Sequence, residues 1–323
     1  MHMKKISLLL FVILATSTCH KNEQEVFMFS YFTGNGEGGL HLAVSEDGFH
    51  WTALNHDETF LKPEVGDAKL MRDPCIIQGG DGRFHMVWTA GWDEKGVGYA
   101  SSNDLLTWSE QTFIPVMGNE PNARNCWAPE LFYDENSGQY LIYWATTIPG
   151  KFSETDSTGD KGYNHRIYFT TTKDFTHFSD AKILYDKGFN VIDASIVKNK
   201  KTYLMFLKNE TLMPKPEKNI RFAKSNHLFE NYSYPSESIS PGWSEGPTAV
   251  KIKNRWIVYF DRYREHQMGA AASTDLIHWT DISDQISFPA GTRHGSVFKV
   301  KKGIVQKITG KDVPTRIDEK EFN

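Results

Sequence analysis

The sequence predicts an all-β protein built as a five-bladed β-propeller, and two observations support this fold class. Short apolar and aromatic runs alternate with Gly-rich turns, a pattern typical of β-hairpins. A second pattern recurs five times at intervals of roughly fifty to seventy residues, in SEDGFHWT, SSNDLLTWSE, TTKDFTHFSD, AKSNHLFENY and ASTDLIHWTD. Repeats of this period indicate structural units arranged radially, as in a propeller.

Each complete unit is predicted to contain four strands. The second unit shows this most clearly, with strands expected at 74–78, 84–89, 97–102 and from 106–108. The first unit lacks a leading strand, and GSVFKVKK at 295–302 supplies one. We therefore expect the C-terminal strand to join the N-terminal blade and close the ring, with a propeller domain at 26–310 and a tail at 311–323. A large β-sandwich is the alternative architecture.

The N-terminal segment has the features of an export signal. Two lysines precede an apolar run at 6–15 that is too short to span a bilayer. We predict a signal peptide at 1–18 and a short tether at 19–25. Cys19 fits the lipidated cysteine of a bacterial lipoprotein, although Thr18 stands where Gly or Ala is usual. Simple secretion and an uncleaved anchor are the alternatives, and the expected location is the bacterial periplasm or cell surface.

The composition limits the classes of partner. The 323 residues carry a formal net charge of −4, so no nucleic-acid partner is expected. Cys75 and Cys126 are too few for a disulfide framework and lack zinc-site spacing, which predicts two buried free thiols and no bound metal. The 9 Trp, 13 Tyr and 21 Phe suit both sheet faces and sugar stacking. We expect a monomer whose only membrane contact would be a lipid anchor.

Ionisable residues stand at the start of every predicted innermost strand, where a propeller lines its central axis. These strand starts are Asp73-Pro74, Pro129-Glu130, Ile192-Asp193, Glu245-Gly246 and Arg293-His294. Proline and the residue before it favour extended backbone at such a position. Four acids and a histidine directed at one funnel indicate a functional site.

Neighbouring carboxylates in a poorly solvated funnel cannot all ionise easily, so their pKa values separate into acid and base roles. Two such carboxylates flanking a bond are the groups that glycoside hydrolysis requires. Calcium binding is one alternative. A structural ion-pair network with Arg72, Arg124 or Arg293 is the other.

The segments RDP, WAPE, VIDASIV, SEGPTAV and RHGSVF occur in this order between about residues 26 and 303, and this order resembles glycoside hydrolase family 43. The resemblance implies a five-bladed propeller enzyme that cleaves arabinose- or xylose-type linkages of plant polysaccharides with inversion. Arabinofuranosidase and xylosidase activities are both open, as is action on galactose-type glycans. A non-catalytic surface glycan-binding propeller is a further alternative. A sialidase-like or a fructan-cleaving propeller fits less well, because the motifs that those enzymes need are absent.

The resemblance also implies catalytic roles. Asp73 matches the general base and Glu245 the general acid, and their carboxyls should stand roughly 6.5–9.5 Å apart to admit a water. Asp193 matches an acid that orients Glu245 and keeps its proton available, because a nearby negative charge favours the protonated form of a carboxyl.

Further residues are predicted to contact the sugar. Trp127 and Glu130 match a segment that helps to form the family's sugar pocket, and His294 matches a central histidine that holds water or an ion. Trp92 and Trp243 lie close to strand starts and suit sugar stacking. Arg293 could pair with a carboxylate or bind a sugar hydroxyl, and both roles are open. No cofactor is required, although a central calcium ion or water near His294 is compatible with these residues.

Overall fold

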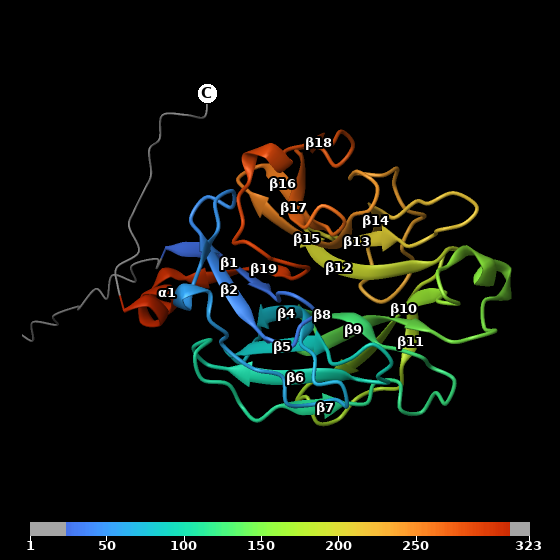
Figure 1. The fold of residues 1–323 in the computed structure, drawn as a ribbon, viewed down its shortest axis with the longest axis horizontal. Coiled ribbons are helices and arrows are strands. Elements are labelled where there is room, and N and C mark those ends of the chain that lie inside the picture. Colours follow the sequence, from blue (N-terminus) through green and yellow to red (C-terminus); the bar gives the residue numbers. More distant parts are fainter. Residues whose placement is uncertain (1–23, 311–323) are drawn as a thin grey trace, which may run out of the picture.

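The computed structural model describes residues 24–310, which form five antiparallel sheets around a central axis (Figure 1). The predicted five-bladed β-propeller is therefore confirmed. The predicted signal peptide at 1–18, the lipidation candidate Cys19, most of the 19–25 tether and the tail at 311–323 lie outside the described residues.

Each sheet forms one blade, and its strands are given from the axis outwards. Blade 1 contains β19 (Ser296–Lys301), β1 (Glu25–Tyr31), β2 (His41–Ser45) and β3 (Thr52–Ala53). Blade 2 contains β4 (Arg72–Gln78), β5 (Phe84–Thr89), β6 (Val97–Ser102) and β7 (Thr112–Ile114). Blade 3 contains β8 (Trp127–Asp134), β9 (Gln139–Thr147), β10 (His165–Thr172) and β11 (Lys182–Tyr185). Blade 4 contains β12 (Val191–Asn199), β13 (Thr202–Asn209) and β14 (Asn219–Ser225). Blade 5 contains β15 (Glu245–Ile252), β16 (Arg255–Arg262), β17 (Gln267–Ser273) and β18 (Thr280–Asp281).

The ring closes as predicted, by pairing of the C-terminal strand with the N-terminal blade. Strand β19 pairs antiparallel with β1, in a register that places Glu25 opposite Lys301 and Ser30 opposite Ser296. The innermost strands β4, β8, β12, β15 and β19 surround the centre of the ring (Figure 1). Residues that are distant in sequence but stand at these strand starts are thereby brought to one end of the axis.

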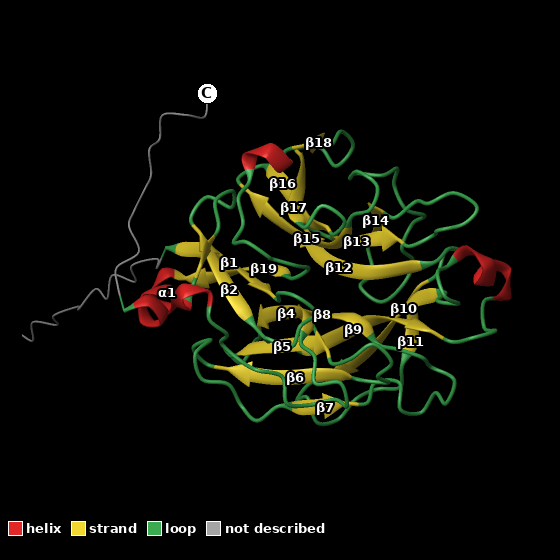
Figure 2. Cartoon of the chain, in the orientation of Figure 1, coloured by secondary structure: helices red, strands yellow, loops and turns green. Residues whose placement is uncertain are grey.

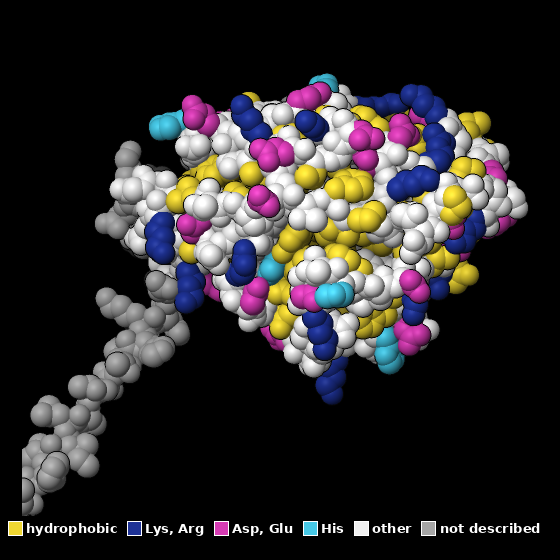
Figure 3. Space-filling view, turned by 90° about the horizontal axis from the view of Figure 1, so that it is seen from below, with side chains coloured by type: hydrophobic (Ala, Val, Ile, Leu, Met, Phe, Trp, Pro, Cys, Tyr) yellow, Lys and Arg dark blue, Asp and Glu magenta, His cyan; other side chains and the backbone are white. Residues whose placement is uncertain are grey.

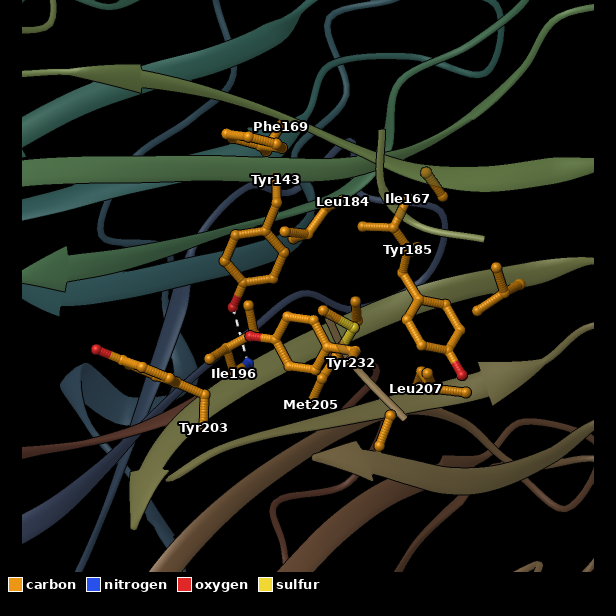
Figure 4. Packing of buried hydrophobic residues seen from close by; sticks show 14 of the residues in the cluster. Tyr143, Ile167, Phe169, Leu184, Tyr185, Ile196, Tyr203, Met205, Leu207 and Tyr232 are labelled. Carbon is orange, nitrogen blue, oxygen red and sulfur yellow. Dashed lines mark hydrogen bonds between the residues drawn. The ribbon is translucent and has the colours of Figure 1, made fainter. Parts of the chain in front are cut away.

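Five clusters of buried hydrophobic side chains fill the five spaces between neighbouring blades. Strand β13 shows how one sequence serves two of these clusters. Met205 and Leu207 face blade 3, whereas Leu204 and Phe206 face blade 5, because successive side chains of a strand point to opposite faces. Figure 4 shows the cluster between blades 3 and 4. Burial on both faces explains why the second strands read as nearly continuous apolar runs.

The recurring sequence pattern forms a turn after the third strand of a blade. In blade 1 the Asp47 carboxylate accepts hydrogen bonds from the backbone N–H groups of Phe49 and His50, at 2.6 and 2.9 Å. Asp104, Asp174 and Asp275 accept equivalent bonds in blades 2, 3 and 5. The predicted strand from 106 is therefore wrong, because Asp104 occupies those N–H groups, and the fourth strand is β7.

Blade 4 has three strands, which corrects the expectation of four in every complete unit. The segment after β14 runs beside it and donates backbone N–H groups to carbonyls of β14, but serine hydroxyls take the place of backbone carbonyls as the acceptors in the other direction. The Oγ atoms of Ser233 and Ser236 accept hydrogen bonds from the N–H groups of Lys224 and Phe222, both at 3.1 Å. Pro235 lies between these serines and has no N–H to donate.

The helical segments lie at the periphery (Figure 2): α1 (Lys302–Thr309), η1 (Asn55–Asp57), η2 (Ser153–Thr158) and η3 (Ser283–Gln285). Within residues 24–310, no helix has the length and apolar character needed to cross a membrane. Cys75 and Cys126 are buried free thiols, as predicted. On the face shown in Figure 3, acidic and basic side chains are interspersed around a central apolar band.

Candidate active site

Four innermost strands carry a β-bulge where they begin. The pairing with the second strand of the blade shifts between Arg72 and Cys75, between Trp127 and Glu130, between Ile192 and Ser195, and between Glu245 and Thr248. A bulge leaves a residue outside the regular ladder and redirects its side chain. The same device thus occurs in four blades at the mouth of the ring.

The bulges place residues in the left-handed region of backbone space. Asp73 and Asp193 both have φ of 53°, Ala128 has 45°, and Gly246 has 60°. Non-glycine residues adopt such angles rarely, and they cluster at functional sites. At Gly246 a Cβ would lie 2.2 Å from Cγ of His294, so only glycine allows this close approach.

The Asp73 carboxylate has two direct side-chain partners, His294 and Thr89. Its Oδ1 lies 3.3 Å from Nδ1 of His294, and its Oδ2 accepts a 2.8 Å hydrogen bond from the Thr89 hydroxyl. That hydroxyl in turn accepts a bond from the N–H of Ala128. Burial alone would raise the pKa of Asp73, but the charges of His294 and Arg72 and the hydrogen bonds outweigh it and lower the pKa to about 2. Asp73 is therefore an ionised acceptor at neutral pH.

His294 lies among the acids. Burial would lower its pKa, but the negative charges of Asp73, Asp193 and Glu245 outweigh burial and raise the pKa to about 9. The imidazole is therefore protonated at neutral pH. It offsets part of the negative charge that the strand starts bring together.

Asp193 contacts the strand that carries Glu245. Its Oδ2 accepts a 3.0 Å hydrogen bond from the N–H of Gly246. Burial raises the pKa of Asp193 to about 6, and the charges of Glu245 and Asp73 act in the same direction. Asp73, Asp193 and Glu245 are thus gathered at one mouth of the ring, linked through His294 and Gly246.

Glu245 lies between two cations. Its Oε2 is 3.1 Å from Nζ of Lys208, and its Oε1 is 3.5 Å from Nη2 of Arg293. Each cation has a second carboxylate partner. Lys208 pairs with Glu210 at 2.7 Å, and Arg293 pairs with Asp261 at 2.7 Å. Arg293 therefore does pair with carboxylates, which was one of its two predicted roles.

Sequence reasoning missed three residues of this mouth: Thr89, Lys208 and Asp261. Each stands at or near the end of the second strand of its blade. Because second strands run antiparallel to first strands, their ends lie beside the first-strand starts, as the pairing of Asp261 with Glu245 shows. A polar residue that ends an apolar run, as in FHMVWT, TYLMFLK and RWIVYFD, is the signal that would have found them.

Glu130 is a buried acid on the axis of the ring. It lines an axial cavity of about 300 Å³ together with Cys75, Ser195 and Thr248. Its Oε2 accepts a 3.2 Å hydrogen bond from the hydroxyl of Tyr143, which itself accepts one from the N–H of Ile196 (Figure 4). Burial raises the pKa of Glu130 to about 7. A contact between Glu130 and sugar stays a prediction.

This burial predicts a pH-dependent effect of Glu130→Gln on stability. The pKa of Glu130 is higher in the folded protein than in the unfolded chain. The stability that this difference contributes is therefore complete at pH values below the unfolded-state pKa, and it is lost as the pH rises through the folded-state pKa of about 7. The glutamine has no such loss. The free energy of unfolding of Glu130→Gln, minus that of the parent protein, should therefore rise between pH 4.5 and pH 8 by up to about 3 kcal/mol. Denaturant unfolding at both pH values measures the change.

Glu110→Gln is the matched control, because Glu110 is exposed. An equal difference between Glu130→Gln and the parent at both pH values would contradict a buried, neutral carboxyl.

Aromatic residues flank the mouth between blades 2 and 3. Trp127 is half-buried, donates its indole N–H to the carbonyl of Trp92, and packs on Tyr163 with ring centroids 4.6 Å apart. Trp92 is 43% exposed. The guanidinium of Arg72 lies 4.4 Å from its ring and 4.7 Å from that of Phe32. Trp92 thus stands beside the residue that precedes Asp73, and Trp127 packs against Trp92.

Trp243 stands two residues before Glu245, at the mouth between blades 4 and 5. One face of its ring carries the guanidinium of Arg264, 3.0 Å from the centroid. Tyr263 packs against its edge at 6.3 Å. Sugar stacking on Trp243 would use the remaining surface of the indole, and this role stays a prediction.

Among residues 24–310, no group of three or more His, Cys, Asp or Glu side chains is placed to hold a metal ion. The acids at the mouth instead have organic cations as partners, namely His294, Lys208 and Arg293.

Comparison with known proteins identifies the family. A model for glycosyl hydrolases related to family 43, described as "Probable glycosyl hydrolase domain", matches residues 22–304. The chain belongs to this family. The resemblance to family 43 that was inferred from the five strand starts is confirmed, and residues 22–304 are the part of the chain that matches this glycosyl hydrolase domain.

Individual relatives are distant. The family-43-related chain is 24% identical over 204 residues to an α-L-arabinofuranosidase of Bifidobacterium longum subsp. longum, which covers 55% of this chain and 19% of that protein. The chain thus spans about a fifth of the length of that curated relative.

Two solved structures share the fold, each with a TM-score of 0.51. A thermostable family-43 glycoside hydrolase is 17% identical, covering 69% of this chain and 78% of its own. An α-L-arabinofuranosidase from Lactobacillus brevis is 16% identical, covering 66% and 72%.

Proposed function

We propose that this glycoside hydrolase removes α-L-arabinofuranosyl units from plant polysaccharides or oligosaccharides with inversion of configuration. The observation that carries the proposal is the convergence of Asp73, Asp193 and Glu245 at one mouth of the ring. The similarity to an α-L-arabinofuranosidase supports this choice of sugar. Export to the periplasm or cell surface, with lipidation at Cys19, belongs to the same proposal.

In the proposed reaction, Asp73 is the general base. Its carboxylate is ionised at neutral pH, and the Thr89 and His294 contacts hold it in one orientation. It accepts a proton from the water that attacks the anomeric carbon. Glu245 gives its proton to the leaving glycosidic oxygen on the opposite side of the sugar.

Asp193 acts through the strand that bears the acid. Its hydrogen bond to the N–H of Gly246 holds the backbone beside Glu245, and its charge favours retention of the Glu245 proton. Trp92 and Trp127 provide apolar surface beside the base, where a sugar ring can stack.

The purified protein tests the proposal on nitrophenyl α-L-arabinofuranoside, nitrophenyl β-xyloside, arabinan, arabinoxylan and galactan. We expect release of arabinose, with the β-anomer as the first product seen by NMR. Hydrolysis of only the xyloside or galactan would overturn the choice of sugar. A first-formed α-anomer would overturn inversion. Retention on polysaccharide without release of reducing sugar would indicate a glycan-binding propeller instead.

A further inference from the structure

Lys208 is the least expected charge at the mouth of the ring. Its side chain is 2% exposed, although it ends in an ammonium group and follows the apolar run YLMFL of β13. A buried lysine requires compensating negative charge. It has two carboxylate partners, Glu245 at 3.1 Å and Glu210 at 2.7 Å.

Glu210 is held from its other side as well, because its Oε1 contacts the Nζ of Lys218, which is also buried. The result is a row of alternating charges, Glu245, Lys208, Glu210 and Lys218, that leads from the mouth into blade 4. Glu245 is the member of this row that stands at the start of an innermost strand, and its side chain is 20% exposed.

We infer that Lys208 is a positioning residue for the reaction, which orients the Glu245 carboxyl and favours its ionised form, while Glu210 moderates this effect. The inference rests on the proposed role of Glu245 as general acid. A general acid must hold a proton, so a cation at 3.1 Å works against the reactive form. Removal of the Lys208 ammonium should therefore extend activity to higher pH.

Other groups also act on the Glu245 carboxyl and stay in place when Lys208 is changed. They come from the neighbouring elements: Arg293, His294, Asp193, Asp261 and Tyr263. The effect of Lys208 is therefore measured as a difference between variants. The pH profile is the readout, because a merely structural role would lower activity without displacing the profile.

The two partners of Lys208 give expectations of opposite sign. Lys208→Met removes the cation, so the alkaline limb of kcat/KM against pH should move up by about one pH unit or more. Glu210→Gln removes one of the two carboxylates that pair with Lys208, so the ammonium acts more strongly on the other, Glu245. The same limb of the pH profile should therefore move to lower pH. Lys224→Met is the matched control, because Lys224 is exposed on β14, and it should leave the limb unchanged.

The test separates this inference from the proposed function. If Glu245→Gln abolishes turnover but neither Lys208→Met nor Glu210→Gln displaces the limb, Lys208 has no such role and the general acid stands. If Glu245→Gln retains normal turnover on unactivated substrates, the proposed acid itself is wrong. Should Lys208→Met fail to fold, the downward shift expected of Glu210→Gln still decides, and an unmoved limb in that variant overturns the inference.

Discussion

Glu245→Gln is expected to lower kcat on arabinan or arabino-oligosaccharides by about 10²–10⁴-fold, because the departing oxygen then leaves without a proton donor. The loss should be much smaller on nitrophenyl arabinofuranoside, whose leaving group needs little protonation. The amide keeps the shape of the carboxyl, and its oxygen can still accept from Lys208 or Arg293. Steady-state kinetics on both substrates measure the difference.

The exposed Glu237 offers the matched control, and Glu237→Gln should leave both rates unchanged. Equal losses on the activated and the unactivated substrate would mean that Glu245 does not protonate the leaving group.

Asp73→Asn is expected to lower kcat by a similar factor, about 10²–10⁴-fold, on both kinds of substrate. A general base acts on the attacking water, so a better leaving group cannot replace it. Asparagine tolerates the left-handed φ of 53° at this position, so the bulge should survive. Kinetics on the same substrate pair, with circular dichroism to confirm folding, make the measurement.

Asp284→Asn, at an exposed acid, is the control for this change. Activity of Asp73→Asn on the nitrophenyl substrate near that of the parent would contradict the role of base.

The strand starts could be predicted because each combines local signals. At Asp73 the following proline and the apolar run after it mark the entrance of a strand, whatever surrounds it. The closing strand was predictable for a similar reason, since the first unit lacked a partner that residues 295–302 could supply. Both features depend on short segments of sequence.

The charges around Glu245 could not be predicted in the same way. Lys208 reads as the polar end of a strand, and only the pairing of β12 with β13 and the packing of blade 4 against blade 5 bring its ammonium to Glu245. The bulges were missed because Asp73, Ala128 and Asp193 have no residue type in common that marks a positive φ. The turn at Asp104 was misread as a strand because side-chain acceptance of backbone N–H groups leaves no trace in hydropathy.

Ring closure by β19 has a consequence for biosynthesis. Arg293 and His294 lie just before this strand, yet they contact Glu245 and Asp73, which are synthesised much earlier. In a nascent chain that stops before these residues, Glu245 and Asp73 lack these two cationic partners. Strand β1 also lacks β19, the strand that pairs with it on the side of the axis. Catalytic competence should therefore arise in one late step, when the final strand docks, and no shortened translation product should be partly active.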